Sequence, residues 1–438
     1  MNFQFLNFQK NIEKILEIGT YAVIFLLPWQ TRWIFETGKI DGIANEFFAG
    51  SIYVLDIFII ALLVLAIFHL GKKIRVNGKL ETKILFLFTV FIIISILFAE
   101  NKMLAWLFGL RLFLATALFW LIINFTEKTK RIVFFVVGMI APAILGIWQF
   151  LSQKTFSFKW LGISEHVASV GGTSIIETYT NGLVSQRWLR AYGSFDHPNI
   201  LGAVMVVGLL LAFYLLIEWK KESWKFSQML FIYLAIVIFA AALFASFSRS
   251  AWIALVLGMF FYGAALLYKK KFSEIKIFIH GILIVFAVFS LMFVKFGDLA
   301  YVRIEAKERL ENLSIDQRVL YIEQSKNIIK GSSFLGVGPG NYVFALSELY
   351  PNKKSWDYQP VHNVFLLIRS ELGIIGLLFV GLCALLLWRQ RNFYMGFLLI
   401  SLIPAMMFDH WIWSLHFGLV FFAVVTAIAV GFYKKEGL

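Results

Sequence analysis

Apolar stretches recur along the whole chain, separated by shorter polar segments. Most have roughly 17 to 25 residues, enough for a helix to cross the hydrocarbon core of a bilayer, which is about 30 Å thick. The pattern predicts an all-α polytopic membrane protein with about twelve transmembrane helices. The expected spans are 15–34, 49–70, 84–99, 103–124, 132–151, 199–218, 228–247, 250–268, 277–296, 362–388, 393–408 and 413–433.

The composition also points to a lipid environment. Of the 438 residues, 60% are hydrophobic and only 15% are charged, whereas soluble domains carry about 25% charged residues. No low-complexity tract or convincing repeat interrupts the pattern, so residues 1–438 are predicted to form a single integral membrane domain. Cys383 is the only cysteine, which excludes an internal disulfide. The N-terminus lacks a cleavable signal pattern, so the first span is expected to remain as an anchor.

Basic residues follow every second predicted span. The positive-inside rule places such loops in the cytoplasm, so both termini are predicted to lie inside. Much of the net charge of +14 is thereby assigned to topology and anionic lipid headgroups, and no basic patch for nucleic acid is left. The residues concerned are Lys72, Lys73, Arg75, Lys79, Lys83, Lys128, Lys130, Arg131, Lys220, Lys221, Lys225, Lys269, Lys270, Lys271, Lys276, Arg389, Arg391, Lys434 and Lys435.

Two long polar segments fall on the extracytoplasmic side of this topology. Segment 152–198 is rich in Gly, Ser and Thr, which predicts a flexible flap. Segment 297–361, between the ninth and tenth spans, interleaves charged with apolar residues. That mixture predicts a large extracytoplasmic loop with two amphipathic helices lying over the mouth of the membrane domain.

Several outer residues are candidates for anion binding. Arg249 joins the seventh and eighth spans with almost no loop, so its side chain is expected in a wet outer cavity. Arg187 and Arg190 could attract an anion or anchor the chain at the interface. Gly338 and Gly340 belong to a tight turn that could expose N–H groups to a phosphate, or could be only a turn.

His362 lies where the outer loop meets the tenth span. Arg369 follows seven residues later, about 700° around a helix, so the two are expected to share a face. Glu371 would then face the opposite side and pair with a neighbouring helix. Arg111 and Asp56, within the fourth and second spans, could pair with each other or line the cavity.

No metal or other cofactor is predicted. The aspartates never fall within three positions of one another, and His410 and His416 lack the spacing of a zinc site. Arginine side chains, by contrast, bind phosphate oxygens through two parallel hydrogen bonds and stay charged. The predicted ligand is therefore a lipid phosphate or pyrophosphate.

Four short motifs occur in a recognisable order. Together they resemble the O-antigen ligase and O-antigen polymerase superfamily of bacterial envelope glycosyltransferases, over about residues 187–380. The motifs are Arg190-Ala191-Tyr192-Gly193-Ser194-Phe195 with Pro198-Asn199, then Ser248-Arg249-Ser250-Ala251, then Arg318 ahead of Gly336-Val337-Gly338-Pro339-Gly340, and finally His362-Asn363 with Glu371-Leu372-Gly373 and Gly376.

The resemblance implies a metal-independent, GT-C-like transferase at the outer side of the cytoplasmic membrane. Its donor would be a glycan on an undecaprenyl-diphosphate carrier, and its acceptor a hydroxyl of a lipid, protein or glycan. Arg249 and Arg318 would hold the diphosphate and stabilise charge on the leaving group, while His362 would act on the acceptor hydroxyl or the diphosphate. Further substrate-binding candidates are Arg190, Arg187, Arg369, Asn363, Gly338 and Gly340.

Two alternatives stay open at this point. A polymerase would join lipid-linked repeat units instead of transferring the glycan to another envelope acceptor, and the shared motifs do not distinguish the two. A polysaccharide or lipid transporter fits the number of spans, but its polar residues would be expected near the membrane midplane. Here they gather at the outer mouth.

Overall fold

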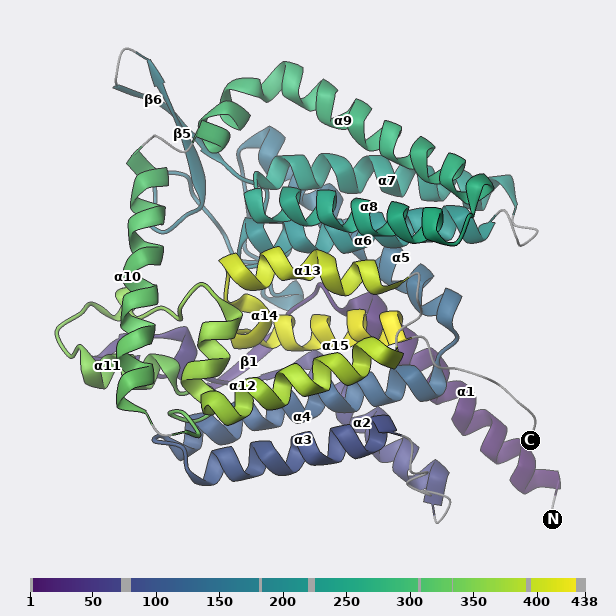
Figure 1. The fold of residues 1–438 in the computed structure, drawn as a ribbon, viewed down its shortest axis with the longest axis horizontal. Coiled ribbons are helices and arrows are strands. Elements are labelled where there is room, and N and C mark those ends of the chain that lie inside the picture. The colour runs from purple at the N-terminus through teal and green to yellow at the C-terminus, as the bar shows by residue number, and fades with distance from the viewer. Residues whose placement is uncertain are drawn as a thin grey trace.

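The computed structural model describes residues 3–71, 80–180, 183–219, 225–305, 309–332, 334–390 and 395–430. Helices dominate this part of the chain (Figure 1), which confirms the prediction of a mainly helical, polytopic architecture. They are α1 (Phe3–Leu26), α2 (Val54–Leu70), α3 (Leu80–Leu97), α4 (Lys102–Phe125), α5 (Lys128–Ser152), α6 (Pro198–Trp219), α7 (Phe226–Ser246), α8 (Arg249–Tyr268), α9 (Phe272–Glu305), α10 (Arg309–Gly331), α11 (Tyr342–Leu349), α12 (Val364–Gln390), α13 (Gly396–Phe408), α14 (Trp411–Ser414) and α15 (His416–Val430).

Seven helical stretches among the described residues are long and apolar enough to cross a membrane. They are α4 to α8, the stretch Phe272–Gly331 that begins with α9, and α12. Four shorter apolar helices are α2, α13, α15 and the Phe86–Leu97 part of α3. With α1, these helices overlap all twelve predicted spans, and the number that cross the membrane stays a prediction.

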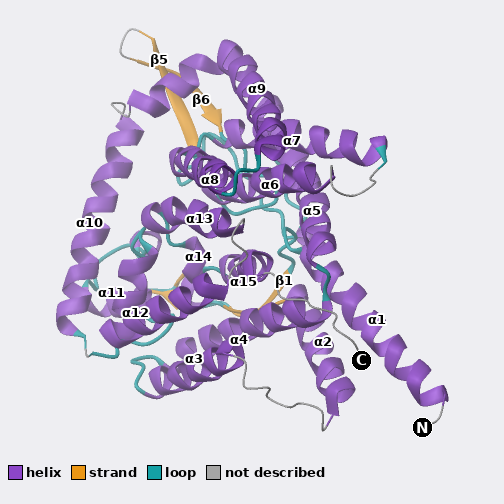
Figure 2. Cartoon of the chain, turned by 45° about the vertical axis from the view of Figure 1, so that its right-hand side comes forward, coloured by secondary structure: helices purple, strands orange, loops and turns teal. Residues whose placement is uncertain are grey.

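Three short pairs of strands lie in the connecting segments of this mainly α-helical fold. Strand β1 (Arg32–Glu36) pairs with β4 (Gly50–Tyr53), β2 (Lys39–Ile40) with β3 (Ile43–Ala44), and β5 (Ile175–Thr180) with β6 (Leu183–Leu189), all antiparallel. The β5–β6 hairpin lies inside the predicted flap, and its strands stand beside the end of α9 in Figure 2. These short hairpins connect helices and do not form a layer of the fold.

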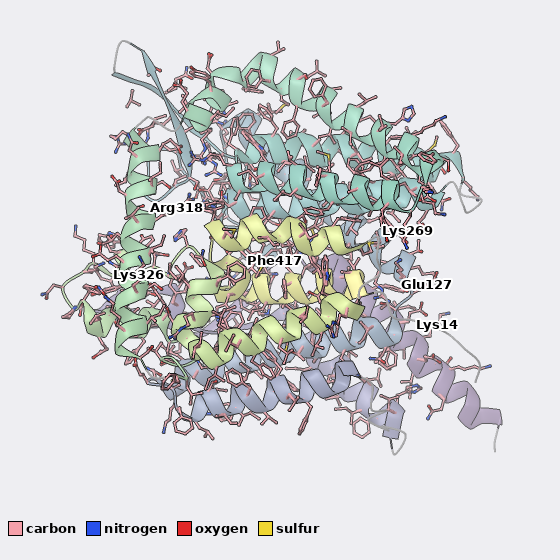
Figure 3. All side chains as sticks on the ribbon, viewed as in Figure 1. Lys14, Glu127, Lys269, Arg318, Lys326 and Phe417 are labelled. Carbon is pink, nitrogen blue, oxygen red and sulfur yellow. The ribbon has the colours of Figure 1, made fainter. Side chains whose placement is uncertain are left out.

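The helices run side by side between two ends of the molecule (Figure 1). The start of α1 and the end of α15 lie toward one end, and α10 crosses the other end at a steep angle to the bundle. Lys14 and Lys269 are at the end where α1 starts, whereas Arg318 and Lys326 on α10 are at the opposite end (Figure 3). Residues from predicted cytoplasmic segments and residues from the predicted outer loop thus lie at opposite ends of the molecule.

Several predicted boundaries need correction. The first span was expected to reach residue 34, but α1 ends at Leu26, just before Pro28, and β1 follows from Arg32. The tenth span was expected to include His362, but α12 begins at Val364. In segment 297–361, α9 continues past a kink at Phe296, and α10 and α11 follow. The following basic or charged residues lie outside the described part: Lys72, Lys73, Arg75, Lys79, Lys220, Lys221, Lys307, Glu308, Arg391, Lys434 and Lys435.

Helix α6 forms the centre of one half of the bundle. Its apolar window is buried all round, because it packs against α5, α7, α8, α9 and α13. Pro198 occupies its first position, where a missing N–H costs nothing. The rigid helix therefore fixes the position of Asn199 in its first turn, at the end of the molecule where α10 lies.

A reporter experiment tests which end faces outward. Alkaline phosphatase, active only outside the cytoplasm, is expected to be active when fused within 300–355 and silent when fused at 269–276, because Lys269, Lys270, Lys271 and Lys276 mark an inner loop. A cytoplasmic reporter at the same two places should give the reverse pattern. Activity of the phosphatase at 269–276 alone would contradict the proposed orientation.

Candidate functional site

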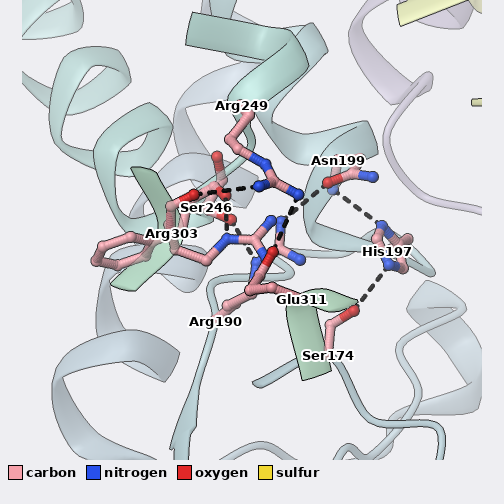
Figure 4. Close-up of polar contacts among 9 residues, drawn as sticks. Ser174, Arg190, His197, Asn199, Ser246, Arg249, Arg303 and Glu311 are labelled. Atoms are coloured by element: carbon pink, nitrogen blue, oxygen red, sulfur yellow. Dashed lines mark hydrogen bonds and ion pairs between the residues drawn. The ribbon is translucent and has the colours of Figure 1, made fainter. Parts of the chain in front are cut away.

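Four arginines and one glutamate, from four separate segments, meet at the α10 end of the molecule. We call Arg190, Arg249, Arg303 and Arg318, with Glu311, the arginine group. The buried Glu311 carboxylate joins two of them: its Oε2 lies 3.0 Å from Arg249 Nη2, and its Oε1 accepts from Arg303. Figure 4 shows these contacts. The local excess of positive charge is three, four guanidinium groups against one carboxylate.

The backbone around Arg249 explains how it reaches this position. Helix α7 ends at Ser246, Phe247 adopts a left-handed conformation with φ 47°, and α8 starts at once with Arg249. The carbonyl of Phe247 accepts a hydrogen bond from Arg303 Nε at 3.2 Å, and Arg249 Nη1 donates to the Arg303 carbonyl at 3.2 Å. The extension of α9 past Phe296 brings Arg303 back to this turn.

Arg190 connects the arginine group to the end of α7 and to Asn199. Its Nε donates to the Ser246 carbonyl at 2.8 Å, and its Nη2 donates to Asn199 Oδ1 at 2.9 Å. Burial lowers the pKa of Arg190 well below its usual value, and the nearby Arg303 charge adds to that effect. Because two nitrogens of this guanidinium already donate hydrogen bonds to protein groups, the fold sets its position.

Arg318 differs from the other three arginines. Among the described residues it has no hydrogen bond or ion pair, although it is half-buried and feels the charges of Asp409, Arg249 and Glu311. All five N–H donors of its guanidinium are thus available to a ligand. An anion at this place would meet a preformed positive site.

His362 lies in the loop just before α12, close to Arg318 and Asp409. Its ring stacks on Tyr321 with centroids 5.3 Å apart and meets the His410 ring edge-on at 4.8 Å. Burial lowers the pKa of His362 below 6.5, Asp409 raises it in part, and Arg318 lowers it again. The ring is therefore neutral at pH 7, and its buried Nδ1 has no hydrogen-bond partner among the described residues.

Asp409 connects His362 to the arginine group. Its Oδ2 accepts from Asn199 Nδ2 at 3.0 Å, and Asn199 in turn accepts from Arg190. Burial alone would raise the pKa of Asp409, but His410, His362, His197 and the Asn199 amide lower it below its usual range. The result is a charged carboxylate held next to His362.

His197 helps to fix Asn199. Its Nδ1 accepts from the Asn199 backbone N–H at 3.1 Å, and its Nε2 lies 2.7 Å from Ser174 Oγ (Figure 4). Burial, with the charge of Arg190 as the next cause, lowers the pKa of His197 to about 3. A neutral His197 is consistent with its role as an acceptor.

Geometry alone would allow a metal ion at His362, Asp409 and His410, since one ligand atom of each lies within 4.8 Å of the others. Existing contacts compete with such an ion. His410 Nδ1 lies 2.6 Å from Ser414 Oγ, Asp409 Oδ1 accepts from the His410 N–H, and Arg318 already supplies positive charge nearby. The fit to a metal is thus weaker than the fit of the arginine group to an anion.

The structure gives Asn363 and Arg369 places that the sequence did not predict. Asn363 caps α12, its Oδ1 accepting from Leu366 N at 3.0 Å, and its Nδ2 donates to the Met407 carbonyl. His362 precedes this cap, so the expectation that it shares a helix face with Arg369 is wrong. No contact of Arg369 with the arginine group occurs among the described residues, and its Nη1 is buried without a hydrogen-bond partner there.

The glycine turn packs on α12. Helix α12 breaks at Gly373, with φ 69°, where an added Cβ would lie 1.8 Å from the Phe334 carbonyl oxygen. The break leaves carbonyls of α12 free for the turn: Ser370 accepts from Val337, and Glu371 accepts from Gly338 at 2.8 Å. The N–H of Gly338 is therefore already used. Gly340 lines a neighbouring pocket instead.

Arg187 lies on β6, apart from the arginine group. Its Nε is 3.5 Å from the buried Glu177 carboxylate, which also binds Arg309 of α10 at 2.9 and 3.0 Å. These contacts attach the β5–β6 hairpin to α10.

Arg111 and Asp56 do not pair with each other: Arg111 donates to Ser51 Oγ, and Asp56 binds His416. Glu371 does bind a neighbouring helix, through Trp413 Nε1 at 2.7 Å.

Comparison with known families bears on this arrangement. Residues 234–381 match the family model described as O-antigen ligase. The resemblance to the O-antigen ligase superfamily is thereby confirmed. The matched segment contains Arg249, Arg303, Glu311, Arg318 and His362, and the match supports a membrane enzyme of the ligase or polymerase type. None of the curated proteins matches the chain significantly.

Sequence reasoning missed several residues of the site. Asn199, Arg303, Glu311, Asp409 and His410 had no assigned role, yet they connect the arginines to His362. Asp409 did carry one signal, because it directly follows the apolar stretch of α13. The other four had no pattern around them that predicts a role in a site. Only the packing of α6, α9, α10 and α13 brings them together.

Proposed function

We propose that this protein is a ligase-type membrane glycosyltransferase. It moves a glycan from an undecaprenyl-diphosphate carrier to an acceptor hydroxyl at the outer side of the cytoplasmic membrane, within a GT-C-like fold. The observation that carries the proposal is the excess of guanidinium charge next to a half-buried, neutral imidazole. The guanidinium groups can bind a diphosphate, and the neutral imidazole can take a proton from a hydroxyl.

Arg249 and Arg318 bind the diphosphate in this proposal. As the bond from the sugar to the carrier breaks, negative charge grows on the leaving diphosphate, and fixed guanidinium groups stabilise it in the transition state. Glu311, which bridges Arg249 and Arg303, holds Arg249 in place without neutralising the group. Arg190 acts through Asn199 to position Asp409.

His362 takes the proton from the attacking hydroxyl. Asp409 stabilises the imidazolium that forms, because its carboxylate is charged and close to the ring. A single displacement of this kind inverts the configuration at the sugar carbon. Arg187, Gly338 and Asn363 have hydrogen-bond or ion-pair partners in the fold, and Gly340 packs close to Phe108, so we assign these four residues supporting roles.

The products made by the purified protein test the proposal. In nanodiscs of membrane lipids, a lipid-diphosphate glycan together with a separate acceptor is expected to give a single addition product. The donor alone should give none. A ladder of longer lipid-linked glycans from the donor alone would assign the protein to the polymerase type instead, and no transfer under either condition would contradict both.

Treatment with a chelator tests the metal-independent chemistry. Dialysis against EDTA is expected to leave the transfer rate unchanged, because the arginines supply the positive charge that a metal would supply elsewhere. The rate is measured before and after dialysis in the same nanodisc preparation. A loss that Mn²⁺ or Zn²⁺ restores would favour an ion at His362, Asp409 and His410.

A further inference from the structure

Helix α10 is held by contacts on either side of Arg318. Near its start, Glu311 binds two members of the arginine group. Farther along, the buried Ser325 Oγ lies 3.1 Å from Ser370 Oγ of α12. Arg318 lies between these contacts and has no hydrogen bond or ion pair of its own among the described residues. The position of its guanidinium group therefore depends on how α10 is held.

The β5–β6 hairpin provides a further contact at the start of α10. Arg309 Nη2 lies 2.9 and 3.0 Å from the two carboxylate oxygens of Glu177 on β5. The next residue, Leu310, packs against a small apolar cluster that includes Ile175 and Leu189 of the hairpin. We call these two interactions the hairpin contact. They join β5 and β6 to the first turn of α10 through one ion pair and one apolar patch.

The hairpin contact and Glu311 hold α10 from different sides. Arg309 and Glu311 are two residues apart, which is about 200° around a helix, so their side chains leave α10 in nearly opposite directions. A single contact would let the helix turn about its own axis, whereas two opposed contacts prevent this. Arg318 follows Glu311 by seven residues, about 700°, and thus lies on the same face of α10 as Glu311. The rotation of α10 therefore decides where Arg318 points.

The hairpin is itself fixed to the membrane helices. The Leu189 N–H donates to Gln153 Oε1 at 2.7 Å, and Gln153 Nε2 donates to the Leu189 carbonyl at 3.2 Å, just after the end of α5. The Ala191 N–H donates to the Ala245 carbonyl at 3.0 Å, near the end of α7. The hairpin thus links α5 and α7 to the first turn of α10.

The burial of Glu177 indicates more than a connecting loop. Its residue is only 4% exposed, and a buried carboxylate is costly unless it is paired. Arg187 stands directly opposite on β6, with Nε 3.5 Å from the carboxylate, and Arg309 comes from α10. One buried charge therefore depends on arginines of both the hairpin and α10, which makes the orientation of the two elements specific.

We propose that the hairpin contact positions Arg318 for glycan transfer, with Glu177 as the positioning residue. The inference rests on the proposed function, in which Arg318 binds the diphosphate. Glu177 does not touch the substrate and acts through Arg309 and the rigid α10. Such positioning matters because a misplacement of roughly 1 Å can cost about 10²-fold in rate. Segment 152–198 would then act as a fixed support for α10, which contradicts its predicted role as a flexible flap.

Distances between spin labels test the contact without requiring turnover. Cys383→Ser removes the only cysteine, and labels are then attached through Gln186→Cys on β6 and Asp316→Cys on α10, both at exposed positions. Pulsed EPR on the whole protein in nanodiscs is expected to give one narrow distance distribution. Adding Arg309→Gln should broaden it. Arg309 is 61% exposed and leaves Arg187 on Glu177, so the variant should still fold.

Transfer rates, measured in the protein without labels, connect the contact to function. Arg309→Gln and Glu177→Gln are each expected to lower transfer about tenfold, within the loss that a small misplacement causes. Because both changes break one interaction, the double variant should be no slower than the slower single variant. Glu165→Gln is the matched control, since Glu165 is an exposed glutamate of the same outer segment without a hydrogen bond or ion pair among the described residues.

Several results would overturn the role of the hairpin contact. They are unchanged EPR distances in Arg309→Gln and Glu177→Gln, full transfer despite broadened distances, losses that multiply in the double variant, or an equal loss in Glu165→Gln. A wild-type protein that transfers no glycan, but whose label distances broaden in Arg309→Gln, would overturn the proposed function alone.

Discussion

His362→Ala is expected to reduce glycan transfer by about 10² to 10⁴, the usual contribution of a positioned general base. The ring is half-buried, neutral and close to Arg318 and Asp409, and it is the group proposed to take the proton. Binding of undecaprenyl diphosphate should persist, because the arginine group remains intact. His280→Ala is the control, since His280 lies exposed on α9 and, within the part of the chain that the structure describes, bonds only to the Lys276 carbonyl.

The pH profile separates a base from a merely structural histidine. A base must be deprotonated, and burial lowers the pKa of His362 below 6.5. Activity should therefore be retained at pH 7 and lost as the pH falls through that lowered pKa, which places the acid limb of kcat/KM below pH 6.5. Asp409→Asn removes the carboxylate that raises this pKa, so the limb should move to still lower pH. Full activity of His362→Ala would exclude the role of base.

Arg318→Lys is expected to lower transfer by about 10² to 10³, the range seen when one donor to a developing oxyanion is removed. Lysine keeps the positive charge but loses the planar pair of donors that matches two phosphate oxygens. Because Arg318 has no hydrogen bond or ion pair among the described residues, the fold should not depend on it. Membrane insertion and thermal stability are therefore expected to match the wild type.

Two further variants interpret that result. Arg249→Lys should also lose transfer, but with some loss of stability, because Arg249 binds both Glu311 and the Arg303 carbonyl. Lys326→Gln removes a charge from an exposed position of the same helix, α10, and should leave transfer unchanged. Wild-type rates in Arg318→Lys would show that paired contact to phosphate is not needed.

The helices of this protein could be predicted from the sequence, because their formation depends on residues that are close together in the chain. Long apolar runs predicted helices that overlap α1 to α9, α12, α13 and α15, since a helix satisfies its own backbone in lipid. Arg249 was singled out because charge beside a membrane span is unusual, whereas Arg318 and the role of His362 came from the family resemblance. All three lie at the α10 end of the molecule in the structure.

The predictions that failed depended on helix boundaries and on distant packing. The shared face of His362 and Arg369 assumed one continuous helix, but Asn363 caps α12 after His362. The glycine turn was a candidate phosphate site, but the break at Gly373 exposes carbonyls that bind the turn. Asp409 and Glu311 reach the site only because α13 and α10 approach α6 and α8, which no local pattern encodes.

A cryo-EM structure of the protein with undecaprenyl diphosphate in a nanodisc tests the central claim most directly. The two phosphates are expected between the Arg249 and Arg318 guanidinium groups, with His362 next to the Arg318 side. Phosphate density at the opposite end of the molecule, near Lys269, with none at the arginine group, would contradict the account.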